Sequence, residues 1–311
     1  MGQKDLWKRY SLEPSVIGVP GMLALEERQF LYHLARDVYR GEGEILDVGA
    51  FIGASACALA AGLRDNPRPI RGQRRIHSYD VFTYGDYYVG YVPEGSWKSG
   101  EDTLPVFRQH TAPFADSIEP IKGDICAQRW DGQPIEILFL DFTQTWDHHE
   151  FVVRTFYPHL IPGNRSVLVH QDFIFTVCYW LHIFMEYYRE CFELIDPHVW
   201  NSTAAWTVKQ ALPPSALAQP LPTRLRFSEL LELLDRSIDR YPEQPWRGVL
   251  DCARARFFLH ALGPKAALEE AKRVECALAQ TPLLEPHYAN LIRDIRCWTP
   301  ERSPYTGFFR I

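Results

Sequence analysis

Short apolar runs that end in an acid, separated by helical segments, constrain the fold of this chain more than any other feature. The acids that close five successive runs are Asp47, Asp80, Asp124, Asp141 and Asp172. Strands that alternate with helices specify a mostly parallel sheet with right-handed crossovers. In such sheets a ligand binds outside the carboxyl ends of the strands. We therefore expect these acids at the edge that carries the ligand.

Two further strand-like runs, 191–198 and 203–212, follow the last of these acids. Only a few residues around Asn201 separate them, which is typical of a hairpin. The predicted fold is therefore a doubly wound α/β domain with a seven-stranded, mostly parallel sheet and a terminal antiparallel hairpin. A C-terminal all-helical module is expected to follow it.

The chain of 311 residues is long enough for one domain of ordinary size and a smaller second one. Residues 25–212 are predicted to form the α/β domain, preceded by an N-terminal extension over residues 1–24. A proline-rich linker is expected over 213–221, and a helical module over 222–311, where apolar residues recur at helical spacing. This module is expected to mediate self-association or to cover the edge of the sheet.

The overall composition excludes several classes of protein. A net charge of -6 without clustered Lys and Arg argues against a nucleic-acid surface and favours a small-molecule substrate. The start of the chain has no apolar core of signal-peptide length, and no membrane-spanning run follows, so a cytoplasmic protein is expected. Seven widely spaced cysteines without a C-x-x-C pair are typical of reduced thiols.

The first predicted strand leads into a glycine turn, Asp47-Val48-Gly49-Ala50-Phe51-Ile52-Gly53. Glycine allows a ligand to approach the backbone closely, and the helix that follows points its N–H groups at the same place. We expect Asp47, Gly49, Phe51 and Gly53 to contact a cofactor. A nicotinamide dinucleotide is disfavoured, because its G-x-G-x-x-G spacing is absent and an acid before the turn repels a pyrophosphate. The same acid suits a cationic amino-acid tail, although an ordinary turn is the alternative.

The next two strands also end in acids with plausible roles. Asp80 can accept both hydroxyls of a ribose, and Asp124, beside Gly123, can hold an adenine amino group. The alternative for both is an acid of a solvated loop or turn.

The order of ILDVGAFIGAS, HSYD, IKGD, ILFLD and PGNRSVLVHQDF resembles the class I S-adenosylmethionine-dependent methyltransferases. The segment from Leu140 to Phe173 is similar to that of the macrocin O-methyltransferase-like group. The resemblance covers about two thirds of the chain. It implies S-adenosylmethionine as cofactor, held by the turn, by Asp80 and Asp124, and by Asp141.

The resemblance also implies a magnesium site at Asp141 and Asp172. This chain departs from the pattern of metal-using members, since Phe142 and Thr143 stand where those have a glycine and a second acid. Gln171 likewise replaces an acid before the last aspartate. Two carboxylates and retained waters still suit octahedral magnesium.

Loss of an acid at Thr143 removes the obvious general base. His170, beside Asp172, is the first candidate to take the acceptor's proton, because a neutral imidazole accepts a proton near physiological pH. A packed core histidine is the alternative for His170. His148 and His149 begin a helix and are expected at the surface.

An aromatic insert from Tyr84 to Trp97 follows the second strand. It is expected to form a lid or a sugar-stacking surface over the ligand edge, and a packed loop or a subunit contact is the alternative.

The sequence thus predicts an enzyme that methylates an oxygen of a small hydroxylated acceptor, such as a sugar or a glycosylated metabolite. The rival is a binding or scaffold protein that keeps the fold, has impaired catalysis and acts through its helical module.

Overall fold

The computed structural model describes residues 6–68, 76–93, 95, 97–278, 281–299 and 309. The chain divides into two compact units. The first unit comprises residues 1–142, 159–171 and 194–209, and the second unit comprises 143–158, 172–193 and 210–311. Parts of three predicted features lie outside the described residues, namely the start of the N-terminal extension, residues 94 and 96 of the aromatic insert, and residues 279–280, 300–308 and 310–311 of the helical module.

A seven-stranded sheet in the order β3-β2-β1-β4-β5-β7-β6 organises the fold. The pairs between β3 and β5 are parallel, and β7 joins β5 in antiparallel register. The predicted fold class, including the terminal antiparallel element, is therefore confirmed. The strands are β1 (Glu44–Val48), β2 (Ile76–Asp80), β3 (Ile118–Lys122), β4 (Ile135–Leu140), β5 (Val167–His170), β6 (Phe192–Trp200) and β7 (Thr203–Val208).

The central strand β4 is buried along its whole length, as a nearly continuous apolar run predicts for a strand in the middle of a parallel sheet. Its one charged residue, Glu136, is only 2% exposed. The Glu136 carboxylate accepts backbone N–H groups from Arg40, Glu42 and Gly43. A buried carboxylate needs such donors, and here it fixes the chain where it enters β1.

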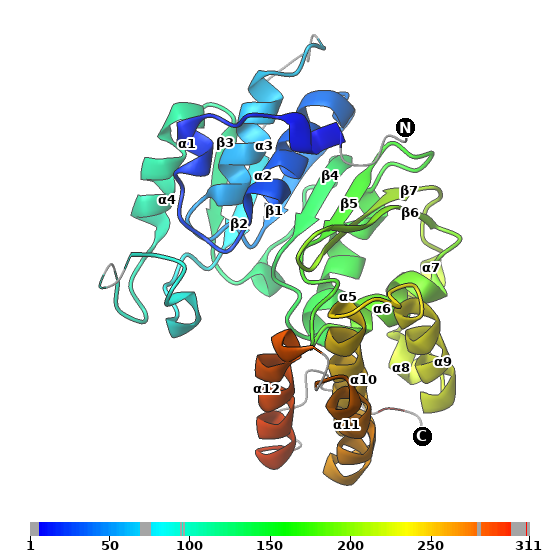
Figure 1. The fold of residues 1–311 in the computed structure, drawn as a ribbon. Helices are drawn as coiled ribbons and strands as arrows, with labels where there is room; N and C mark the ends of the chain where they lie inside the picture. The colour runs from blue at the N-terminus through cyan, green and yellow to red at the C-terminus, as the bar shows by residue number, and fades with distance from the viewer. Residues whose placement is uncertain are drawn as a thin grey trace. The chain divides into compact units, whose positions relative to one another are not determined.

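Helices of the first unit pack on the sheet through an extended apolar core. The small-residue segment forms helix α3 (Ala54–Arg64), which lies against α2 (Leu25–His33) and its π-helical continuation Leu34–Val38 (Figure 1). A Cβ atom at Gly62 would lie 2.3 Å from the carbonyl oxygen of Tyr32, so the close approach requires glycine. The remaining elements are α1 (Pro14–Ile17), α4 (Leu104–His110) and short 3-10 turns at Leu6–Arg9, Asp86–Tyr88, Ala112–Phe114 and Ile125–Ala127.

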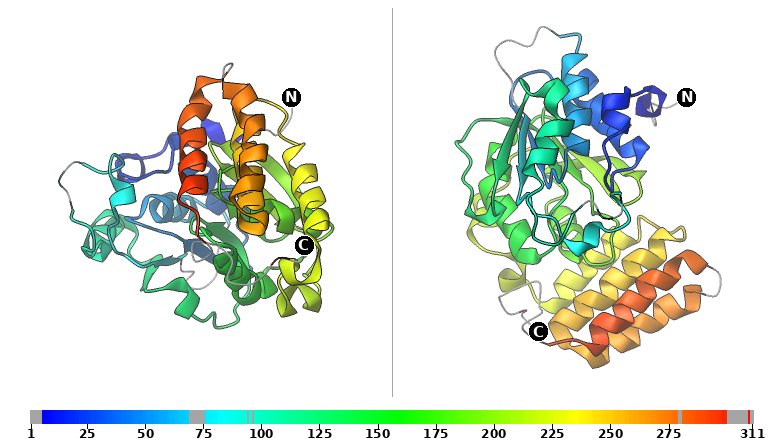
Figure 2. Two further views of the ribbon diagram at one scale, coloured as in Figure 1. Left: turned by 90° about the horizontal axis from the view of Figure 1, so that it is seen from below. Right: turned by 90° about the vertical axis from the view of Figure 1, so that its left-hand side faces the viewer.

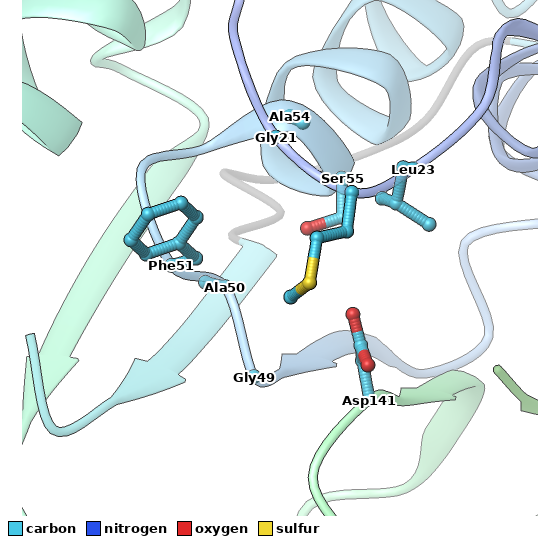
Figure 3. Close-up of a pocket in the computed structure, with 9 residues that line it drawn as sticks. Gly21, Leu23, Gly49, Ala50, Phe51, Ala54, Ser55 and Asp141 are labelled. Atoms are coloured by element: carbon cyan, nitrogen blue, oxygen red, sulfur yellow. The ribbon is translucent and has the colours of Figure 1, made fainter. Parts of the chain in front are cut away.

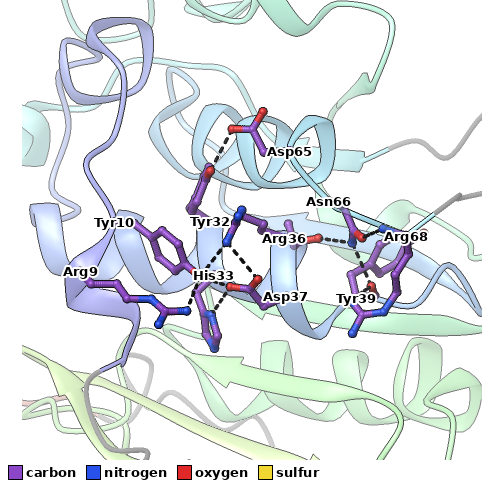
Figure 4. A network of polar contacts seen from close by, with 11 residues as sticks. Arg9, Tyr10, Tyr32, His33, Arg36, Asp37, Tyr39, Asp65, Asn66 and Arg68 are labelled. Atoms are coloured by element: carbon purple, nitrogen blue, oxygen red, sulfur yellow. Dashed lines mark hydrogen bonds and ion pairs between the residues drawn. The ribbon is translucent and has the colours of Figure 1, made fainter.

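A polar network joins the N-terminal segment to the end of α2 (Figure 4). Tyr10 donates its hydroxyl hydrogen to Asp37, and Arg36 donates to the Tyr10 oxygen at 2.9 Å. His33 completes the network, with its Nδ1 2.9 Å from the Asp37 carboxylate. The N-terminal segment is therefore fastened to the first unit at a point well before α2 begins.

The second unit is helical (Figure 2). Helix α6 packs against α9 and α10, and α10, α11 and α12 share a small apolar core. None of the helices in the described part of the chain is long and apolar enough to cross a membrane. The helices are α5 (Trp146–Thr155), α6 (Tyr179–Tyr187), α7 (Pro214–Ala218), α8 (Leu221–Arg224), α9 (Phe227–Ile238), α10 (Trp246–Leu262), α11 (Pro264–Leu278) and α12 (Glu285–Arg296), with 3-10 turns at Tyr157–His159 and Pro282–Leu284.

The proline-rich stretch 213–221, which the sequence predicts to be a linker, contains the short helix α7 and the first residue of α8. Proline occupies an early position in both, where its missing N–H has no helical partner to lose. The prolines therefore start helices here and do not keep the chain extended.

Candidate cofactor site

The glycine turn follows β1, and close contact with the neighbouring strand fixes its shape. Gly49 has φ +96°, and a Cβ atom there would lie 2.3 Å from the carbonyl oxygen of Asp141. The N–H of Asp141 in turn donates to the Val48 carbonyl at 2.8 Å. Only glycine fits this position, because both the backbone conformation and the space exclude a side chain.

Two further residues of the turn, Phe51 and Gly53, also have backbone conformations that L residues rarely adopt. Phe51 has φ +44°, and Gly53, which begins helix α3 as its N-cap residue, has φ +102°. A bulky residue in the left-handed region is an outlier that the surrounding structure must hold in place. Two contacts do so: the Phe51 N–H donates to the Asp80 carboxylate at 2.9 Å, and its ring stacks on Tyr88.

Asp80, the predicted ribose acid, orders the backbone of the turn. Its two carboxylate oxygens accept the N–H groups of Phe51 at 2.9 Å and Phe82 at 2.6 Å. Burial raises the pKa of Asp80, and these two hydrogen bonds oppose that shift. Each carboxylate oxygen has a second lone pair, so the ribose contact stays a prediction beside this structural role.

Asp47 lies in β1 and has no exposed surface. The Ser78 hydroxyl donates to its Oδ2 at 2.9 Å. Burial raises the pKa of Asp47 to about 7, although hydrogen bonds from the Ser55 and Ser78 hydroxyls act in the opposite direction. With this pKa, Asp47 gains or loses its proton near neutral pH. It lies in β1, two residues before Gly49 of the turn.

A pocket opens at this turn (Figure 3). Its walls come from three segments that are distant in the sequence, and the lining residues are Gly21, Met22, Leu23, Gly49, Ala50, Phe51, Ala54, Ser55 and Asp141. The turn after β1 and Asp141 after β4 meet at the point where the strand order of the sheet reverses. Ligands of doubly wound sheets bind at this point.

Of the predicted cofactor residues, the pocket brings together Gly49, Phe51 and Asp141. The sequence does not indicate the wall formed by Gly21, Met22 and Leu23. These residues belong to the predicted N-terminal extension, which has no periodic pattern. The one local feature that could have drawn attention to them is Pro20-Gly21, a turn dipeptide just before a helix that begins with acidic residues.

Asp124, the predicted adenine contact, is an exposed residue that follows β3. Its side chain accepts the N–H of Cys126 at 2.9 Å and so caps a short 3-10 turn. The preceding Gly123 donates its N–H to the Asp80 carbonyl at 3.0 Å, which keeps the ends of β2 and β3 together. This cap agrees with the alternative that Asp124 is an acid of a turn. The adenine contact stays a prediction.

His170, the predicted base, is the last residue of β5 and is 0% exposed. Its ring meets Trp206 of β7 edge to face, with ring centroids 5.7 Å apart. This is the environment of a packed core histidine. A role as proton acceptor stays a prediction that requires access to a deeply buried ring.

The second unit holds the other predicted residues. Gln144 donates to the Asp172 carboxylate at 2.7 Å, and loss of hydration raises the pKa of Asp172 to about 6. Thr143 is buried, and its carbonyl accepts the indole N–H of Trp180. Among the described residues, no group of three or more His, Cys, Asp or Glu side chains is arranged to hold a metal ion. No donor cluster in this part of the chain thus supports the predicted magnesium site at Asp141 and Asp172.

The expected surface position of His149 is wrong. His149 is 0% exposed, and its ring lies 4.7 Å from that of Phe184, edge to face. Burial lowers the pKa of His149 to about 3, so the ring stays neutral at physiological pH. His148 lies in the first turn of α5, where its N–H donates to the Thr145 hydroxyl, and is half-buried.

The aromatic insert packs on the glycine turn. Phe51, Tyr84 and Tyr88 form a small buried cluster with Ile52, against which Trp97 also packs. The rings of Phe51 and Tyr88 are parallel, with centroids 3.6 Å apart and planes inclined by 7°. The insert is thus attached to the pocket wall through Phe51.

Comparison with known proteins gives fold-level likenesses. No family model matches the chain, and no curated protein matches it. Similar solved structures include the O-methyltransferase NovP, at 12% identity and a TM-score of 0.47 over 62% of this chain and 83% of that one. A second is a methyltransferase from Geobacter sulfurreducens, at 16% identity and a TM-score of 0.42 over 65% of this chain and 91% of that one. A third is an O-methyltransferase from Bacillus cereus in complex with SAH, at 14% identity and a TM-score of 0.38 over 62% of this chain and 86% of that one.

Proposed function

We propose that this chain is an S-adenosylmethionine-dependent methyltransferase that acts on an oxygen of a small hydroxylated acceptor, such as a sugar or a glycosylated metabolite. The observation that carries the proposal is the pocket at the reversal point of a sheet ordered β3-β2-β1-β4-β5-β7-β6. Asp141 is the charged residue of the pocket lining, and no Lys or Arg is among the lining residues. That charge pattern suits a cationic ligand and disfavours a phosphate.

The residues present fit such a cofactor. Gly49 and Phe51 of the turn line the pocket, so the backbone of the turn borders the space where the ligand would bind. Asp141 lines the pocket, and Asp47 lies behind Ser55, which also lines it. These carboxyl groups would attract the positive charges of the ligand, and Asp80 would accept ribose hydroxyls.

Bound S-adenosylmethionine would supply a methyl group already activated by its sulfonium charge. The chain's own task is then to align donor and acceptor, which by itself is worth several kcal/mol of the barrier. The acceptor hydroxyl must also lose a proton. His170 and Asp172 are the two proposed proton acceptors, and separate substitutions distinguish them. Because no donor cluster among the described residues supports a magnesium site, we derive no step through a metal.

Calorimetric titration of the full chain tests the proposal. We expect S-adenosylhomocysteine and S-adenosylmethionine to bind and NAD not to bind. Asp80→Asn should weaken binding about tenfold or more, the loss expected for charge-assisted hydrogen bonds. Asp116→Asn, at an exposed position, is the matched control and should bind like the natural chain. Equal affinities in the two variants would contradict the ribose assignment.

The acceptor class requires a second experiment. The chain is incubated with methyl-labelled S-adenosylmethionine and a panel of sugars, glycosides and phenols, and labelled products are identified by mass spectrometry. Label on a sugar or glycoside oxygen would support the proposal. Transfer only to nitrogen or carbon acceptors would contradict it.

A binding or scaffold protein of the same fold is the second candidate. The residues Thr143 and Gln171, which replace acids of the resembled family, favour it, as does the hydrogen bond from Gln144 to Asp172. This candidate predicts cofactor binding without methyl transfer to any acceptor. Self-association through residues 222–311 also stays a proposal, which light scattering coupled to size exclusion tests.

A further inference from the structure

The segment that connects β5 to α6, residues 172–178, is largely buried although it forms only turns and bends. It begins with Asp172, one of the two proposed proton acceptors, and Phe173 and Thr176 within it are buried. Buried backbone groups need hydrogen-bond partners, and a segment without a helix or strand must find them elsewhere. Two of its carbonyls find them on side chains of the helical second unit.

Arg256 of α10 holds the carbonyl of Thr176. Its Nη1 donates to this carbonyl oxygen at 3.1 Å, while Nε and Nη2 donate to one oxygen of Asp294 in α12 at 3.0 and 2.7 Å. Arg256 is only 3% exposed. The guanidinium is planar, so its pairing with Asp294 fixes the direction in which Nη1 points. The position of Thr176 therefore depends on two helices from the C-terminal part of the chain.

Helix packing alone does not explain a buried arginine at this position. Removing a charge from water costs free energy, and well-packed apolar side chains in place of a buried ion pair are often equally or more stable. Arg254, two residues earlier in α10, pairs with Asp235 of α9 and Glu270 of α11 and so links helices to one another. Arg256 differs, because one of its donors is directed at the main chain of the 172–178 segment. This difference indicates a role in shaping that segment.

His182 of α6 holds the carbonyl of Phe173, the residue next to Asp172. Its Nε2 lies 2.7 Å from the carbonyl oxygen, and its Nδ1 lies 2.9 Å from the hydroxyl oxygen of Ser237 in α9. Burial lowers the pKa of His182 to about 3, so the ring is neutral and carries one N–H. A carbonyl oxygen only accepts, so Nε2 is the donor and Nδ1 accepts the hydroxyl hydrogen of Ser237. Helix α9 thus fixes the ring that holds Phe173.

The segment after β4 is tied to the same region. The carbonyl of Thr143 accepts the indole N–H of Trp180 at 3.1 Å and the thiol of Cys178 at 3.7 Å. Gln144 donates to the Asp172 carboxylate at 2.7 Å. Ligands of doubly wound sheets bind outside the carboxyl ends of the strands, and the segments after β4 and β5 both leave such ends. These connections therefore fix a carboxylate at a place where an acceptor can be bound.

We propose that Arg256 and His182 are positioning residues, which hold the main chain of residues 172–178 and thereby keep Asp172 in the orientation that methyl transfer requires. Asp172 then receives the proton that the acceptor hydroxyl loses when its oxygen gains the methyl group. The helices after residue 222 contribute to the reaction in this way, whether or not they mediate self-association. The role in methyl transfer rests on the proposed function, whereas the holding of the segment does not.

Thiol labelling of the full chain tests whether Arg256 holds the segment. Cys178, just before α6, and Cys191, just after it, are both buried, so each reacts only when the protein opens. In Arg256→Met, labelling of Cys178 by a small thiol reagent should accelerate at least tenfold relative to labelling of Cys191, as followed by mass spectrometry. Arg254→Met removes a buried arginine from the same helix and should leave this ratio unchanged. Equal ratios in the two variants would overturn the proposal.

A pair of variants at His182 covers the case in which Arg256→Met does not fold. His182→Leu removes the donor to the Phe173 carbonyl, whereas the side-chain amide of His182→Gln keeps an N–H for it. Labelling of Cys178 relative to Cys191 should rise at least tenfold in the leucine variant and stay within threefold of the natural chain in the glutamine variant. The same ratio in both variants would contradict the role of His182.

Methyl transfer and cofactor binding distinguish positioning from a general structural role. With a sugar or glycoside acceptor, kcat of Arg256→Met should fall at least tenfold, while the affinity for S-adenosylhomocysteine stays within twofold. Arg254→Met should change neither quantity. An unchanged kcat in Arg256→Met would overturn the role in the reaction. If the natural chain transfers no methyl group, the proposed function fails, and the labelling ratio still decides whether Arg256 holds the segment.

Discussion

Replacing Asp47 by Asn should make the protein more stable at neutral pH. Asp47 is fully buried, and its pKa is raised from 3.8 to about 7. The native state therefore keeps the proton between about pH 4 and 7, whereas the unfolded state loses it. Because the unfolded state binds fewer protons in this range, the free energy of unfolding falls as pH rises through it.

The size of the effect follows from the two pKa values. One pKa unit corresponds to about 1.4 kcal/mol, so the interval from 3.8 to about 7 amounts to about 4 kcal/mol. Asparagine has nearly the shape of the protonated acid and no charge to bury. We expect the advantage of Asp47→Asn over the natural chain to be close to zero at pH 4 and to grow to as much as about 4 kcal/mol at pH 7.5.

Equilibrium urea denaturation at several pH values measures this difference, with Asp116→Asn as the exposed control. The same substitution should weaken S-adenosylmethionine binding about tenfold at pH 8, where the natural acid is ionised, because one attractive charge near the pocket is lost. At pH 5.5 the two proteins should bind alike. A stability difference that is independent of pH would refute the raised pKa.

The remaining predictions concern the turn and the chemistry. Gly49→Ala should destabilise the protein by about 3 kcal/mol, because its Cβ would meet a backbone carbonyl at 2.3 Å. Gly90→Ala, with a similar φ of +91° and open space, should cost only about 1 kcal/mol in the same denaturation assay. Tyr88→Leu should remove a stacking contact worth about 1 kcal/mol and weaken S-adenosylhomocysteine binding severalfold by calorimetry. Methyl transfer should persist in excess EDTA. Complete loss of this activity in EDTA would instead support the metal site at Asp141 and Asp172. If His170 is the base, His170→Ala should lower the rate of methyl transfer about a hundredfold, and if Asp172 is the base, Asp172→Asn should do so. Unchanged rates in both variants would show that neither residue is the base.

The strands and the glycine turn could be predicted because local patterns determine them. A run such as Ile135–Leu140 is apolar along its length, and it becomes a strand buried on both faces. The acids after the strands also follow from the sequence, since parallel strands end at one edge. Their partners do not: Asp80 binds backbone amides of Phe51 and Phe82, which only the folded turn brings to it.

The path of residues 18–24, which connect α1 to α2, could not be predicted, because it depends on contacts with Arg28 of α2. Val16, Val19 and Leu23 have no common period, and what unites them is that their carbonyls face one arginine. The burial of His149 was missed for a similar reason. The beginning of a helix is usually solvated, but here the side chain meets Phe184 of α6, about 35 residues later in the sequence.

The parallel stack of Phe51 on Tyr88 has a consequence for how such a protein can diversify. A loop of variable sequence usually accumulates changes independently of the scaffold beneath it. Here a ring of the insert also supports a residue of the pocket wall in an unfavourable backbone conformation, so the two segments share one energetic constraint. A substitution of Tyr88 that alters this stack will also change how well the turn at Phe51 is held. Substitutions at Tyr88 of the insert and at Phe51 of the turn would then have to be compatible with each other.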